Sequence, residues 1–187
     1  MQSRWAEACG FTLVETVIGA TMIVVAVFGL IQLFVVSARA NAHAHDTTFA
    51  AVLAAEKMEQ LRALTWGYDT AGLPVGDVTT DIAVFPERSS GGTGLSPSPF
   101  DTLFRNTQGY CDFLDARGDS FASGTNPPPG TRYIRRWAVE RLPADPTNGL
   151  VLQVRVVERT AASVEARGRG RVPGEAWLLS VKTRKQA

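Results

Sequence analysis

The strongest constraint on this chain is a long uncharged stretch close to its N-terminus. From Phe11 to Ala38 there are 28 residues and a single ionisable side chain, Glu15. The part after it, Thr16 to Ala38, has 23 residues and would be about 35 Å long as a helix. Because the hydrocarbon core of a bilayer is about 30 Å thick, this segment is long enough to cross a membrane.

The apolar stretch is predicted to stay on the protein as an anchor. A cleaved secretory signal has an apolar core of roughly 7–15 residues and a small-x-small cleavage site after it. This stretch is longer, and no such site follows it. Cys9 lies before the apolar run and not after it, which argues against a lipoprotein signal.

The rest of the composition argues against several classes of function. Lys and Arg total 19 against 18 Asp and Glu, so the net charge of +1 gives no reason to expect a nucleic-acid partner. The histidines of the sequence are His43 and His45, and its cysteines are Cys9 and Cys111. A Ser/His/Asp or Cys/His site in the C-terminal two thirds would need a histidine there. We therefore expect a protein that is not an enzyme.

The junction between the N-terminal leader and the apolar stretch carries a specific motif. A short polar leader, MQSRWAEACG, is followed by Gly10-Phe11-Thr12-Leu13-Val14-Glu15 and then by the apolar run. This arrangement resembles the class III signal of type IV pilins and type II secretion pseudopilins. The resemblance implies that a prepilin peptidase cuts after Gly10 on the cytoplasmic side and that Phe11 is N-methylated. Removal of the ten-residue leader would leave 177 of the 187 residues.

The resemblance also implies a role in assembly for Glu15, which would pair with the Phe11 amine of a neighbouring subunit. A carboxylate at mid-bilayer costs about 2.5–3.5 kcal/mol on insertion scales. An amine and a carboxylate held together in a low-dielectric filament core each lower the other's burial cost, whereas removing one leaves an uncompensated charge. The alternative is an interfacial Glu15 whose carboxylate reaches the membrane surface.

The sequence predicts that the helix continues beyond the membrane to about Thr65. Apolar side chains recur near the helical period and most charged ones lie on the other side, and Gly67 is a natural stop. A helix over residues 11–65 would be roughly 80 Å long. The predicted organisation is a leader (1–10), a transmembrane half of the helix (11–38), a periplasmic half (39–65) and a globular β-rich head (66–187).

The head is predicted to be an antiparallel β-meander of three or four strands. Tyr133–Leu142, Leu150–Arg159 and Glu175–Thr183 are typical of strands, and Val78–Phe85 is a candidate for a shorter one. The segment Tyr133–Val139 also resembles the head of PilV-like minor pilins. The expected fold class is therefore α+β, with a long N-terminal helix packed on a C-terminal antiparallel β-meander in a pilin-like arrangement.

Three acidic residues are a weak candidate for a metal site. Asp112, Asp115 and Asp119 lie close together in the sequence, and some pilin-like heads hold calcium through such residues. Their spacing does not fit the EF-hand pattern, so we prefer a solvated acidic turn. We expect no cofactor, with calcium as the alternative.

Three further features have an ordinary explanation that we prefer. Arg117-Gly118-Asp119 spells an adhesion tripeptide, but an ordinary turn explains it. The glycine-interleaved Arg167, Arg169 and Arg171 could contact phosphates, but we prefer a solvated hairpin loop. Cys111 would be the only cysteine after processing, so it has no intramolecular partner for a disulfide and is either buried or reactive.

The sequence favours a non-enzymatic minor pilin subunit of a type IV pilus. The alternatives are a minor pseudopilin of a type II secretion system and, from a different class, a membrane-anchored periplasmic binding domain. The expected partners are the prepilin peptidase, other pilins or pseudopilins in a helical filament, and the inner membrane. Arg4 favours a cytoplasmic N-terminus and a periplasmic head, although Glu7 and Arg39 weaken the charge bias.

Overall fold

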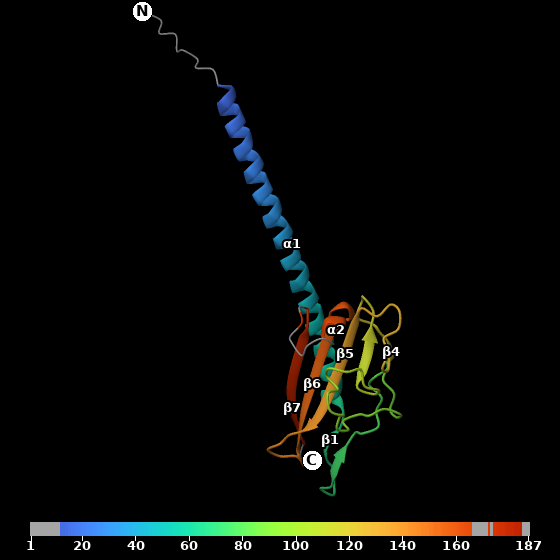
Figure 1. Cartoon of the computed structure of the whole chain (residues 1–187). Coiled ribbons are helices and arrows are strands. Elements are labelled where there is room, and N and C mark those ends of the chain that lie inside the picture. Colours follow the sequence, from blue (N-terminus) through green and yellow to red (C-terminus); the bar gives the residue numbers. More distant parts are fainter. Residues whose placement is uncertain (1–11, 166–171, 173, 185–187) are drawn as a thin grey trace, which may run out of the picture. The chain divides into compact units, whose positions relative to one another are not determined.

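The structure, a computed structural model, describes residues 12–165, 172 and 174–184 (Figure 1). The chain divides into two compact units, Met1–Ala42 and His43–Ala187. A single helix, α1 (Leu13–Ala63), contributes its first part to one unit and its last part to the other. We describe each unit separately and call the second one the head unit.

The first unit consists of the N-terminal part of α1. Within the described part of the chain, α1 is the one helix that is long and apolar enough to cross a membrane. The hydroxyl of Thr16 donates to the carbonyl of Leu13 at 2.9 Å, and that of Thr21 donates to the carbonyl of Val17 at 2.7 Å. These hydroxyls are satisfied inside the helix, which suits a segment surrounded by apolar material.

In the head unit, the last part of α1 packs on a sheet. Its buried side chains recur every three or four residues and therefore share one face: Ala50, Leu53, Ala54, Lys57, Met58 and Leu61. The helix was expected to reach about Thr65 and ends at Ala63, before Gly67. At this end the Lys182 ammonium donates to the carbonyls of Leu61, Arg62 and Leu64, which satisfies carbonyl groups that the helix itself leaves without a partner.

The described part of the head contains two antiparallel sheets and a short helix. The elements and their bounds are β1 (Trp66–Tyr68), β2 (Pro74–Gly76), β3 (Cys111–Leu114), β4 (Ser120–Ser123), β5 (Tyr133–Arg141), β6 (Gly149–Glu158), α2 (Arg159–Glu165) and β7 (Ala176–Thr183). Strands β1 and β2 form a hairpin. The other strands form a five-stranded sheet in the order β4-β3-β5-β6-β7, and every neighbouring pair is antiparallel.

The three strands that the sequence predicted most clearly are confirmed as β5, β6 and β7, and they form a meander. In its register Trp137 lies opposite Val154, which lies opposite Leu178. These side chains belong to the core between the sheet and α1, while the residues that alternate with them, such as Gln153, lie on the outer face. The fold is therefore the expected α+β arrangement of a long N-terminal helix on a C-terminal antiparallel sheet.

The strand predicted over Val78–Phe85 is wrong. This segment forms only an isolated bridge between Asp81 and Arg88. Its aspartates explain the difference, because the Asp77 carboxylate accepts the backbone N–H groups of Thr79 and Thr80 at 3.0 Å. Aspartate side chains that bind neighbouring backbone groups compete with strand pairing.

The sequence did not predict β3 and β4, which extend the meander on the other side of β5. All four side chains of β3 are buried, including that of Asp112. The charge at this position hid the strand, although the residues on either side of Asp112 are apolar: Tyr110, Cys111, Phe113 and Leu114.

A leucine-to-alanine substitution should lower the free energy of unfolding by different amounts on the two faces of the sheet. Leu152 on β6 is fully buried under α1, so we expect Leu152→Ala to lower the free energy of unfolding by about 2–5 kcal/mol. Leu179 on β7 is 64% exposed, so Leu179→Ala should cost no more than about 0.5 kcal/mol. Urea denaturation of a fragment of residues 43–187 measures both. Equal losses would contradict the packing described.

Candidate functional site

The first candidate site is the surface of α1 within its first unit. Its large apolar side chains are exposed on every side of the helix: Leu13, Val14, Val17, Ile18, Met22, Ile23, Val24, Val25, Val27, Phe28, Leu30, Ile31, Leu33, Phe34, Val35 and Val36. We call this the apolar helix surface. A soluble monomer rarely exposes so large an apolar area, so lipid or other protein chains have to cover it.

Glu15 is the acidic residue of the apolar helix surface and lies in the first turn of α1. Thr12 precedes the helix, and its hydroxyl accepts the backbone N–H of Glu15 at 3.3 Å. A threonine followed three residues later by glutamate is the capping-box pattern, in which the glutamate supports the start of the helix. Among the described residues, the Glu15 carboxylate forms no hydrogen bond or ion pair, so the printed contact is that of the threonine half of the pattern.

The capping pattern gives Glu15 a second possible role that the sequence analysis missed. The signal was present in the string Thr12-Leu13-Val14-Glu15, which was interpreted only through the resemblance. The predicted cleavage and methylation positions, Gly10 and Phe11, lie outside the described residues. The pairing of Glu15 with a neighbour's amine therefore stays a prediction.

A buried network of charges joins α1 to the sheet inside the head. Asp112 on β3 receives a bidentate pair from Arg135 on β5, with Nε at 3.0 Å and an Nη at 2.7 Å. The ammonium of Lys57 on α1 lies 3.0 Å from the same carboxylate and donates to the carbonyl of Ile82. Asp112, Lys57 and Arg135 are all nearly inaccessible to solvent, and we call them the buried triad.

The buried triad makes two further contacts with α1 and the core. The Arg135 guanidinium donates to the carbonyl of Leu53 at 3.0 Å and reaches the half-exposed carboxylate of Glu56 at 3.3 Å. The Lys57 ammonium lies 4.6 Å from the centre of the Trp137 ring. Together these contacts fix both the rotation of α1 and its position along the sheet, since a shift of α1 by one residue would separate the charges.

The triad also sets the charge states of its members. Burial alone would raise the pKa of Asp112, but the Lys57 ammonium and the Arg135 guanidinium outweigh it and hold the pKa below its ordinary value. Burial lowers the pKa of Lys57, and the attraction of Asp112 opposes this only in part. Asp112 is therefore an ionised structural partner of two cations.

The position of Asp112 corrects the interpretation of the acidic residues. Asp112 is buried in β3 and is not part of a solvated turn. The Asp115 carboxylate instead accepts the backbone N–H groups of Arg117 and Asp119, at 2.8 and 3.0 Å. The described residues contain no group of three His, Cys, Asp or Glu side chains placed to hold a metal ion. The structure thus does not assemble Asp112, Asp115 and Asp119 into a calcium site.

The remaining sequence features also find a place in the structure. The tripeptide Arg117-Gly118-Asp119 lies in a turn, where Gly118 has a positive φ of 91° and donates its N–H to the Asp115 carbonyl. Cys111 is buried, its thiol donates to the carbonyl of Gly124 at 2.8 Å, and burial raises its pKa, so it is not a reactive thiolate. Residues 167–171, with their three arginines, include no described residue.

Comparisons of the chain with family models, with curated proteins and with solved structures find no match.

The buried triad predicts a pH-dependent loss of stability. Asp112→Asn removes the buried carboxylate that pairs with both Lys57 and Arg135 and leaves Arg135 only the half-exposed Glu56, so the free energy of unfolding should fall by roughly 3–5 kcal/mol at pH 7. Because folding lowers the pKa of Asp112 below 3.8, its contribution is complete above that value and is lost as the pH falls through the folded pKa. The difference between wild type and variant should therefore shrink below about pH 4.

Chemical denaturation of the fragment of residues 43–187 between pH 3 and pH 7 measures this difference. The matched control is Glu59→Gln, which removes an exposed carboxylate paired with Arg62 on the same helix. This control should cost less than about 1 kcal/mol at any pH. A loss for Asp112→Asn that is equally small, or that does not depend on pH, would contradict the role given to the triad.

Proposed function

We propose that this protein is a minor pilin, a subunit that a prepilin peptidase processes and that joins a type IV pilus through its N-terminal helix. The observation that carries the proposal is the apolar helix surface, whose charge-free length follows Glu15 directly. A filament core made of such helices would cover the surface with identical or related helices. Before assembly, the inner membrane would cover it.

The proposal is supported by the different properties of the helix and of the head. The apolar helix surface provides a wide apolar contact that does not require a specific partner sequence. The head has a separate hydrophobic core and separate buried ion pairs. Subunits related by head-to-tail contacts that do not close into a ring form an open helical filament. Glu15 supplies the one charge by which neighbouring helices would find a fixed axial position, through the amine of a processed Phe11.

Two alternatives remain alongside the pilus. A minor pseudopilin of a type II secretion system would use the same helix and the same processing, so the proposal extends to it without change. A membrane-anchored periplasmic binding domain would need the apolar helix only as an anchor. A membrane anchor does not require a glycine, a phenylalanine and a glutamate at positions 10, 11 and 15, so this alternative leaves the motif unexplained.

The proposal predicts processing after Gly10. In cells that also express a prepilin peptidase, the intact mass should correspond to residues 11–187 plus one methyl group on Phe11. A bulky side chain before the cut would block the peptidase, so Gly10→Leu should leave the 187-residue form, whereas the control Cys9→Leu should be processed. Retention of the full mass in wild type would contradict the proposal.

Substitutions at Glu15 can distinguish a role of its charge from a role in helix capping. A glutamine fits the capping box as well as a glutamate, but it carries no charge to pair with an amine. We therefore expect Glu15→Gln to reduce filaments as strongly as Glu15→Ala, because each contact loses an ion pair whose disruption costs roughly 3–5 kcal/mol. The control Thr12→Ala removes the capping hydroxyl and should have the milder effect.

The measurement is the number of surface filaments per cell together with the amount of this subunit in the sheared fraction. Normal filaments in Glu15→Gln and few in Glu15→Ala would show that Glu15 acts through capping. Normal recovery of the subunit in both variants would show that neither role matters for assembly.

A further inference from the structure

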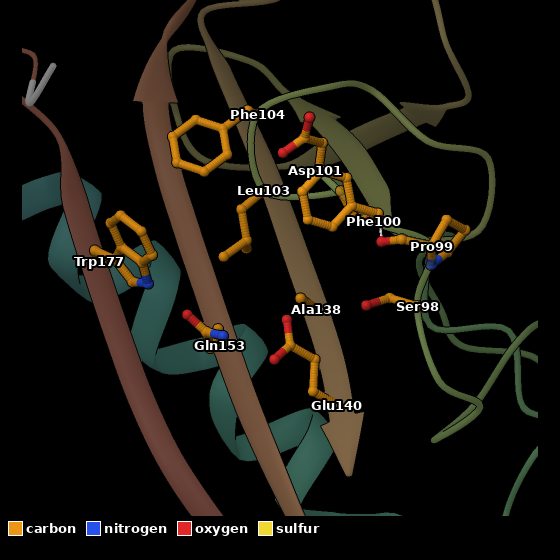
Figure 2. A pocket seen from close by; sticks show the side chains of 11 residues that line it. Ser98, Pro99, Phe100, Asp101, Leu103, Phe104, Ala138, Glu140, Gln153 and Trp177 are labelled. Carbon is orange, nitrogen blue, oxygen red and sulfur yellow. Dashed lines mark hydrogen bonds between the residues drawn. The ribbon is translucent and has the colours of Figure 1, made fainter. Parts of the chain in front are cut away.

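The outer face of the main sheet carries a cleft of about 510 Å³ that the proposed assembly through α1 does not use. A loop over residues 98–104 forms one wall, and residues from three neighbouring strands form the floor and the opposite wall: Ala138 and Glu140 on β5, Gln153 on β6 and Trp177 on β7. Figure 2 shows these side chains facing one another across the cleft. Its volume is in the range of known small-molecule pockets.

The loop that forms the wall is held rigidly on the sheet. The backbone N–H of Ser98 donates to the carbonyl of Val139 at 2.9 Å, and the N–H of Val139 donates to the Ser98 hydroxyl at 3.2 Å. The carbonyl of Leu103 accepts from two buried guanidiniums, those of Arg136 at 3.3 Å and Arg155 at 3.2 Å. A loop anchored at both ends loses little conformational entropy when it binds a partner.

This rigid loop presents an aromatic side chain to solvent. The Phe100 ring is 90% exposed, and Trp177 across the cleft is 42% exposed. Asp101, which follows Phe100, has a φ of 62°, a left-handed conformation that is uncommon for a residue other than glycine. Exposed aromatic residues on a preorganised backbone are typical of the central contacts of protein interfaces.

Charged side chains lie in and next to the cleft. The two guanidiniums below it, of Arg136 and Arg155, are accompanied by three carboxylates: Glu175, which holds Arg155 in a bidentate pair, and Asp101 and Glu140, which line the cleft. Glu140 is exposed and forms no ion pair with any described residue, so its carboxylate is open to a cation from outside.

We propose that this cleft binds a segment of a partner protein that inserts an arginine or lysine side chain next to an apolar one. Phe100 and Trp177 would contact the apolar side chain and the aliphatic part of the basic one, and Glu140 would pair with the cationic group. The Gln153 amide, on the floor beside Glu140, offers a further hydrogen bond. The proposal does not rest on assembly through α1, because every residue of the cleft belongs to the head unit.

The test uses the full-length protein in non-ionic detergent and two fluorescent peptides of the sequence Ser-Gly-Leu-Arg-Gly-Ser, one of them with citrulline in place of arginine. Citrulline keeps the shape of arginine and lacks its charge. We expect the arginine peptide to bind at least tenfold more tightly in fluorescence anisotropy. Glu140→Gln should abolish this preference, and Phe100→Ala should weaken both peptides at least tenfold.

Two matched controls lie elsewhere on the head. Glu87→Gln removes an exposed carboxylate and Phe121→Ala an exposed ring, and neither residue lines the cleft, so both variants should bind as wild type does. Equal affinity for the two peptides, or unchanged binding in Glu140→Gln and Phe100→Ala, would overturn the proposal. Binding to neutral glycans on an array that is lost in Trp177→Ala and kept in Glu140→Gln would assign the cleft to carbohydrate instead.

Discussion

The packing of α1 on the sheet of the head depends on a buried ion cluster. The bidentate pair between Asp112 and Arg135 joins two neighbouring strands, and Lys57 extends it to α1. Replacing such a cluster by apolar side chains is often neutral for stability, whereas breaking it is costly. Its value here is specificity, since apolar packing alone would allow α1 to rotate or slide on the sheet. The cluster thereby makes the end of a long helix part of a uniquely ordered head.

The sequence predicted those parts of the fold that a clear period defines. The long helix and strands β5, β6 and β7 follow from apolar spacing, because one of their faces is buried. Strand β3 was missed because Asp112 is buried only through cations that come from residues 57 and 135, far away in the sequence. The sequence around Asp112 gives no sign of cationic partners that are distant in the sequence. The strand predicted at Val78–Phe85 failed for a local reason, the turns that its aspartates form.

The two candidate sites also differ in how far the sequence alone predicts them. The apolar helix surface and Glu15 are visible in the sequence because they occupy one continuous segment. The cleft on the outer face is not, since residues 98–104 meet side chains from β5, β6 and β7 only after folding. The two sites also differ in chemistry: the helix offers a wide apolar contact, while the cleft offers a small one with exposed aromatic rings beside the exposed Glu140. Under the proposed function, the chain would join an assembly by its helix and recognise a partner by its head.

The claim that other protein chains cover the apolar helix surface can be tested most directly by crosslinking in the native cell. Phe34, which is 79% exposed, can be replaced by a photoreactive phenylalanine analogue without adding charge to the helix. After illumination, we predict crosslinks to proteins whose own N-terminal helices begin with the same glycine, hydrophobe and glutamate pattern. Crosslinks to lipid alone, in cells that assemble their filaments normally, would show that the helix is only an anchor and would contradict the account.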